Sequence, residues 1–180
     1  AEPLLPGLPF AQRIEHLSLS ALKYLHDGQI DEAIIAIEQC LRLFDRPSQS
    51  MNIFACTPLS IAIFEVKRRR PDTNIKKWWG KTRDFMRAYS SIFPVGLPVL
   101  HYQTGMYESL CGNLSRAVKC WRKALNSSID IDIPYIVVAS VNALQRVDPG
   151  TLAIYRASYD SALLKMGVEE VADSLGVTRN

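Results

Sequence analysis

Residues 80–82 read Gly-Lys-Thr, which is how a phosphate-binding loop ends. The complete loop also needs a glycine five places before Gly80 and a strand before the loop, but this chain has Ile75 there, in a helical pattern. Without a glycine-rich turn, backbone amides cannot converge on a phosphate. The sequence therefore does not predict a nucleotide site at this position.

The chain also contains histidines, serines and aspartates, but their spacing matches no catalytic motif. The histidines, His16, His26 and His101, lie far apart and none has metal-ligand spacing. No serine stands in a G-x-S-x-G turn. Asp130 and Asp132 are two residues apart, so they would face different directions on a helix, and we expect them to cap the helix that follows. The sequence predicts no metal, no cofactor and no catalytic residue; enzymatic activity would lie in other domains of a parent protein.

The four cysteines form no C-x-x-C pair. Three of them lie in helical patterns beside apolar residues, where a reduced cysteine acts as a small hydrophobe. This usage favours a reducing compartment, and we expect a cytoplasmic protein. Neither a signal peptide nor an apolar run of about 18 residues is present, so we expect no membrane span.

The periodicity of apolar residues predicts an all-α chain of about eight or nine helices, stacked as antiparallel hairpins. The opening ten residues contain three prolines, so we expect 1–10 to be a lead-in or linker and 11–180 to be the helical-repeat domain of a larger protein. Residues 131–138 are rich in β-branched types and could form a strand, but the following residues restore helical spacing. The predicted helices cover approximately 14–25, 30–44, 57–70, 74–91, the residues up to 110, 115–127, 134–146, 151–166 and 168–175. We expect Pro58 to lie in the first turn of the third helix, where proline is tolerated, and Ser115 to be the N-cap of the sixth.

Two segments of the chain match at fixed offsets from Gly28 and Gly112, which we expect to be hairpin turns with left-handed backbone. Small and large residues alternate at equal offsets, as needed when helix axes approach closely and large side chains fill the next turn. The matched pairs are Ala21 and Gly105, Ala33 and Ala117, Ile37 and Trp121, Cys40 and Ala124, and Leu41 and Leu125. Trp121 is therefore predicted to be a core residue rather than part of a site.

This pattern resembles the tetratricopeptide repeat, whose hairpins carry small and aromatic residues at these places. The chain departs from it because the two glycines are 84 residues apart, which is not a multiple of about 34, and because the usual first-helix tryptophan is missing. The order of segments over 92–175 also resembles the C-terminal repeat region of soluble-type adenylyl cyclases and related NTPase-containing signalling regulators. That resemblance implies a non-catalytic regulatory module, with cyclase or NTPase chemistry elsewhere in the parent protein.

Residues 67–87, called the basic segment below, have the most uneven charge in the chain. The segment holds nine cations and two acids, a net charge of +7 in a chain whose total is +3. Adjacent Trp78 and Trp79 cannot both face one stripe of a helix, so one is expected in the core. The segment is either a solvated face or a contact for an acidic protein, a nucleic acid or an anionic membrane.

We expect a protein-interaction or intramolecular regulatory module, with a nucleic-acid-binding helical repeat that uses residues 67–87 as the alternative. In a tetratricopeptide-like array the first helices line a groove, which would place Leu22, Leu25, Tyr102 and Met106 there. Burial of these four under a neighbouring hairpin is the other interpretation. The candidate partner-binding residues are those four together with Lys67, Arg68, Arg69, Arg70, Lys76 and Lys77.

Overall fold

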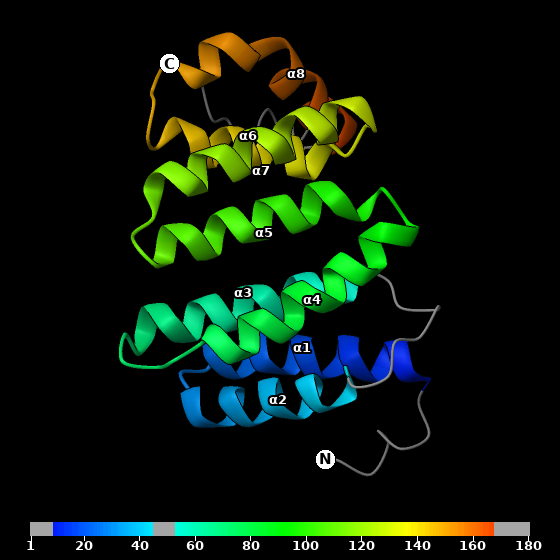
Figure 1. Cartoon of the computed structure of the whole chain (residues 1–180), viewed down its shortest axis with the longest axis vertical. Coiled ribbons are helices and arrows are strands. Elements are labelled where there is room, and N and C mark those ends of the chain that lie inside the picture. The colour runs from blue at the N-terminus through cyan, green and yellow to red at the C-terminus, as the bar shows by residue number, and fades with distance from the viewer. Residues whose placement is uncertain (1–8, 45–52, 168–180) are drawn as a thin grey trace. The chain divides into compact units, whose positions relative to one another are not determined.

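The computed structural model describes residues 9–44 and 53–167, and these residues are helical throughout, apart from the turns that join the helices (Figure 1). The predicted all-α, repeat-like fold is confirmed, with eight helices in the described residues, and 131–138 are a turn and the start of a helix instead of a strand. The expected ninth helix and most of the expected lead-in lie outside the described residues. The helices are α1 (Phe10–His26), α2 (Ile30–Leu43), α3 (Ile53–Arg69), α4 (Lys76–Ile92), α5 (Gly96–Leu110), α6 (Leu114–Asp130), α7 (Pro134–Gln145) and α8 (Thr151–Lys165).

The two predicted hairpin glycines end α1 and α5 in the same way. Gly28 has φ +77° and Gly112 has φ +81°, which is the left-handed region that glycine enters without a steric cost. After Gly28, the Gln29 N–H donates to the Tyr24 carbonyl at 2.8 Å, and after Gly112 the Asn113 N–H donates to the Glu108 carbonyl at 2.8 Å. These are the long hydrogen bonds of a Schellman ending, so the turn prediction is confirmed.

Several predicted helix ends are wrong. Ser115 is not an N-cap, because α6 already begins at Leu114 and the preceding Asn113 makes no side-chain cap hydrogen bond. Asp130 and Asp132 do not cap α7, since Asp130 still belongs to α6 and Ile133 is the residue before α7. Asp132 instead has φ +58° and accepts a hydrogen bond from Lys165 Nζ at 2.6 Å. Also, α3 begins at Ile53, so Pro58 lies inside the helix and not in its first turn.

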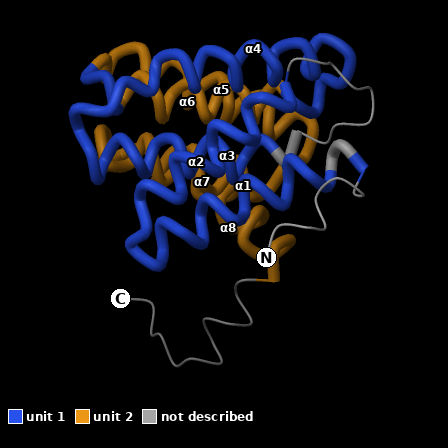
Figure 2. The backbone as a smooth tube through the Cα atoms, turned by 90° about the horizontal axis from the view of Figure 1, so that it is seen from below, with its two compact units in different colours: residues 1–96, 110–112 blue, residues 97–109, 113–180 orange. Residues whose placement is uncertain are grey.

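The chain divides into two compact units, residues 1–96 with 110–112 and residues 97–109 with 113–180 (Figure 2). In unit 1, α1 packs on α2 and α3, while α4 packs on α2 and α3. The core contains fully buried Ile14, Ile37 and Met86, and the rings of Phe64 and Trp79 lie 5.3 Å apart. First helices of consecutive hairpins therefore contact each other, as do the second helices, which is the arrangement of a helical repeat.

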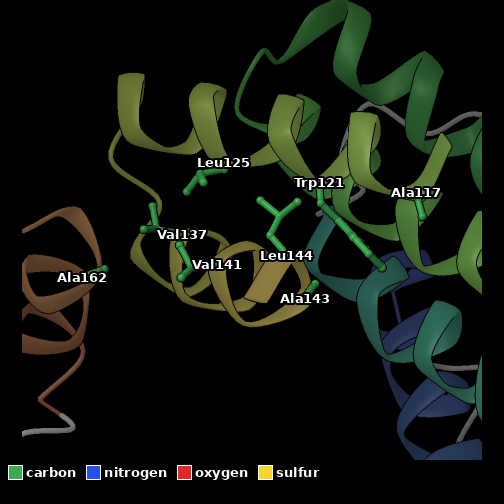
Figure 3. Close-up of a cluster of buried hydrophobic side chains, with 8 residues drawn as sticks. All are labelled: Ala117, Trp121, Leu125, Val137, Val141, Ala143, Leu144 and Ala162. Carbon is green, nitrogen blue, oxygen red and sulfur yellow. The ribbon is translucent and has the colours of Figure 1, made fainter. Parts of the chain in front are cut away.

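Unit 2 is built on α6, α7 and α8, with α6 packing on α7 and α7 on α8. The side chains that fill it are drawn in Figure 3: Ala117, Trp121, Leu125, Val137, Val141, Ala143, Leu144 and Ala162. Trp121 is 4% exposed, so its predicted core position is confirmed. A Cβ added to Gly105 of α5 would lie 2.5 Å from Cδ1 and Nε1 of Trp121. The small-and-large pairing expected from the repeat offsets therefore exists between these two residues.

Candidate functional site

The cations at the end of α3 bind to groups inside unit 1. Lys67 Nζ donates to the carbonyl oxygens of Pro71 and, at 3.1 Å, of Thr73. Arg70 Nη1 lies 2.6 Å from Asp31 Oδ1 at the start of α2. The hydrogen bond from Arg70 lowers the pKa of the Asp31 carboxyl below its ordinary value. Both cations thus stabilise the turn after α3 and its contact with the α1–α2 hairpin.

Arg68 and Arg69 share one acidic partner on their own helix. Glu65 accepts hydrogen bonds from Arg69 Nε at 2.9 Å and from Arg68 Nη1 at 3.2 Å, and these bonds lower the pKa of its carboxyl. Arg69 Nη1 also donates to the carbonyl of Leu25, in the last turn of α1. The guanidinium therefore neutralises a helix C-terminus as well as an acid, which is a structural use of the cation.

The cations at the start of α4 have a different environment. Lys76 and Lys77 are exposed and occupy the first turn, which contains no acidic residue. Trp79 is 2% exposed and lies in the core, which confirms that one tryptophan of the pair is buried; Trp78 is half-buried. The Trp78 indole therefore lies partly open beside Lys77.

A hollow of about 310 Å³ lies between α2 and α4, and Trp78 and Lys77 form part of its wall. Its lining residues are Glu38, Leu41, Arg42, Lys77, Trp78 and Lys81. It thus combines three cations, one carboxylate, an indole and an aliphatic side chain within a single concavity. All six residues belong to unit 1.

Two cations of the hollow have no acidic partner among the described residues. In the part of the chain that the structure describes, neither Arg42 nor Lys77 donates a side-chain hydrogen bond or forms an ion pair. Glu38 lies one turn before Arg42 and is not paired with it either. In contrast, Arg83 and Arg87 each lie 3.2 Å from Asp84. Arg42 and Lys77 are therefore two cations of the hollow that remain able to bind an external ligand.

Sequence reasoning missed Arg42, Glu38 and Leu41 as members of this surface. Their i, i+3 and i+4 spacing places them on one face of α2, and that signal was present in the sequence. The sequence does not indicate which face of α2 packs near the start of α4.

The four expected groove residues are divided between the two units. Leu25 is 2% exposed and belongs to the core of unit 1, whereas Leu22 is half-buried. Tyr102 and Met106 are half-buried and pack against the Trp121 cluster of unit 2. Packing under neighbouring helices thus accounts for Leu25 completely and for Tyr102 and Met106 in part.

Cys40, Cys56 and Cys120 lie in environments that do not activate a thiol. Burial raises the pKa of Cys40 to about 12 and also raises that of Cys56. Cys120 has a raised pKa as well, from partial burial and the charge of Glu108. A thiol that stays protonated is a poor nucleophile and a poor ligand. Among the described residues, no group of three or more histidine, cysteine, aspartate or glutamate side chains could hold a metal ion.

No protein family, curated protein or solved structure matches the chain. The described helices include none that has both the length and the apolarity needed to cross a membrane.

Proposed function

We propose that this chain is a non-catalytic helical-repeat module that binds a protein, either a separate partner or a flanking domain of its own chain. The observation that carries the proposal is the hollow of unit 1, where Arg42 and Lys77 have no partner in the part of the chain that the structure describes and lie beside the half-buried Trp78. A tryptophan or arginine at the centre of a concave surface is the kind of residue that most often dominates protein binding. A regulatory role in a cytoplasmic signalling protein, as implied by the resemblance to adenylyl cyclase repeat regions, is part of the same proposal.

The alternative is a nucleic-acid-binding helical repeat that uses residues 67–87. An indole beside cations is suited to stacking a base next to a phosphate, which supports this alternative. However, Arg68, Arg69 and Arg70 are paired with acids of unit 1, so much of the segment's charge is already neutralised. Nonspecific nucleic-acid binding depends on many simultaneous phosphate contacts. We therefore prefer a protein partner.

A capture experiment from cell extract tests the proposal. The immobilised chain is compared with Lys76→Glu/Lys77→Glu, which reverses the charge at the start of α4, and with Tyr102→Ala/Met106→Ala. The matched control is Lys119→Glu/Arg122→Glu, which makes the same charge change on exposed residues of α6.

We expect the wild type and the α6 control to retain one protein partner that the Lys76→Glu/Lys77→Glu variant loses, with unchanged helical circular dichroism. Loss of the partner in the Tyr102→Ala/Met106→Ala variant alone would instead locate the contact on unit 2. If only nucleic acid is retained, and its release depends steeply on salt, the alternative replaces the proposal.

A further inference from the structure

We propose that the hollow between α2 and α4 binds an acidic peptide segment, with a carboxylate between Arg42 and Lys77 and an apolar side chain against Trp78. This inference rests on the proposed function and names the site and the ligand class.

The charges favour a carboxylate ligand. Arg42 and Lys77 come from different helices and line the same concavity, and neither is paired with an acid within residues 9–44 and 53–167. Two like charges held near each other are unfavourable until an anion lies between them. Because a guanidinium presents two parallel N–H donors, Arg42 can hold a carboxylate through both of its oxygens. Lys77 would then supply a point charge from α4.

The apolar part of the hollow selects against a small free anion. Trp78 is half-buried, so its ring offers apolar area that a bare phosphate or carboxylate would not cover. Leu41 is almost completely buried and forms part of the lining near the indole. A volume of about 310 Å³ accommodates a few side chains and not a folded domain. A short segment that alternates acidic and apolar residues fits these properties.

Glu38 favours a peptide over a nucleic acid as the occupant of the hollow. Its carboxylate lines the hollow and has no partner among the described residues. It would repel the phosphates of a nucleic acid, and it equally disfavours a second carboxylate beside the one held by Arg42 and Lys77. In contrast, it can accept a hydrogen bond from a backbone N–H of a peptide, which a nucleic-acid backbone lacks. The neighbouring cations of α3 are already paired and do not extend the hollow into a continuous basic stripe.

The test uses the 180-residue chain and immobilised nonapeptides that have aspartate or glutamate at five positions and leucine, valine or phenylalanine at the other four. A second set carries lysine or arginine in place of the acids, and oligothymidylate serves as the nucleic-acid probe. We expect binding to the acidic set only, with about tenfold or greater loss in Arg42→Gln/Lys77→Gln, since charge-assisted hydrogen bonds are lost. The α6 variant Lys119→Gln/Arg122→Gln is the matched control and should bind like the wild type.

Tryptophan fluorescence supplies an independent readout. Because Trp79 and Trp121 are buried, an occupant of the hollow should change the emission of Trp78 in particular, and the change should disappear in Trp78→Phe. The inference is overturned if the acidic peptides bind no better than the basic ones, or if the α6 control loses binding equally. It is also overturned if oligothymidylate binds the hollow and the peptides do not. Should peptide binding fail while a protein is still captured from extract, only the ligand assignment falls; failure of both removes the proposed function.

Discussion

The contact between Gly105 and Trp121 allows a quantitative test of the packing of unit 2. In Gly105→Ala the new methyl group would lie 2.5 Å from Cδ1 and Nε1 of the indole, closer than Cβ atoms come to other atoms in proteins. Trp121 is buried, so the ring cannot rotate into solvent without emptying part of the core. Its Nε1 makes no hydrogen bond within the described residues, and the cost of moving it is therefore steric.

Two opposing contributions set the change in the free energy of unfolding that Gly105→Ala should cause. Overpacking a well-filled core costs about 1–3 kcal/mol, whereas alanine in place of glycine inside a helix gains about 0.5–1 kcal/mol. We expect the free energy of unfolding to fall by about 1–2 kcal/mol. Because the melting temperature of a chain of this size falls by about 2–4 °C per kcal/mol, it should be lower by about 2–8 °C. Thermal and urea unfolding followed by circular dichroism and by tryptophan fluorescence measure both quantities.

Gly80 provides the matched control. It lies inside α4, and a Cβ placed on it would meet nothing within 4 Å. Gly80→Ala should therefore raise the melting temperature by about 1–4 °C, the opposite sign for the same chemical change. A second comparison places Gly105→Ala in a Trp121→Leu background, where the steric cost should shrink. If Gly105→Ala stabilises the protein as Gly80→Ala does, the close packing inferred for unit 2 is refuted.

Three further predictions concern the thiols and the charges of unit 1. Iodoacetamide should modify the exposed Cys111 in the native protein and reach Cys40 only on unfolding, because Cys40 is buried and burial raises its pKa to about 12. Peptide mass spectrometry measures the modification of both cysteines, and equal rates of modification would contradict the structure. Since the folded-state pKa of Asp31 is lowered from 3.8, its pairing with Arg70 stabilises the fold above that pH and is lost as pH falls through the lower value. The difference in urea midpoint between wild type and Arg70→Gln should therefore be present at neutral pH and shrink as the pH falls below 3.8; a difference that persists in strong acid would exclude this pairing as its cause. Lys77→Gln should raise the melting temperature by about 1–3 °C at low salt, because a cation in the first turn opposes the helix dipole; no change or a decrease would show that Lys77 has a partner within the protein.

The repeat pattern made the helices and much of the core predictable. Offsets from the two glycines correctly placed Ala33, Ala117 and Trp121 in the interior, because close helix packing imposes the same size alternation on every hairpin. Local signals were less reliable at helix ends. Pro58 suggested a first turn, but α3 begins five residues before it. Tertiary packing of an apolar stretch can override such a local preference.

The partners of the cations could not be predicted from the sequence. The contact of Arg69 with the Leu25 carbonyl spans 44 residues, and that of Arg70 with Asp31 spans 39. Periodicity identifies which face of a helix is buried, but it does not say which groups a long, flexible side chain will reach. For the same reason the hollow was missed, since it depends on the register between α2 and α4.

The cations of the basic segment, residues 67–87, form two groups whose charges have different roles. At the end of α3, Arg69 compensates both an acid and the C-terminal carbonyls of α1, so removing its charge should weaken the fold. At the start of α4, Lys77 lies at the positive end of its own helix and lines the same hollow as Arg42, so we expect its charge to oppose stability. A residue whose charge is unfavourable in the free protein gains most when an anion binds, because binding removes the repulsion and adds an ion pair. The two halves of the segment should therefore respond oppositely to neutralisation, with stability lost in the first and ligand affinity lost in the second.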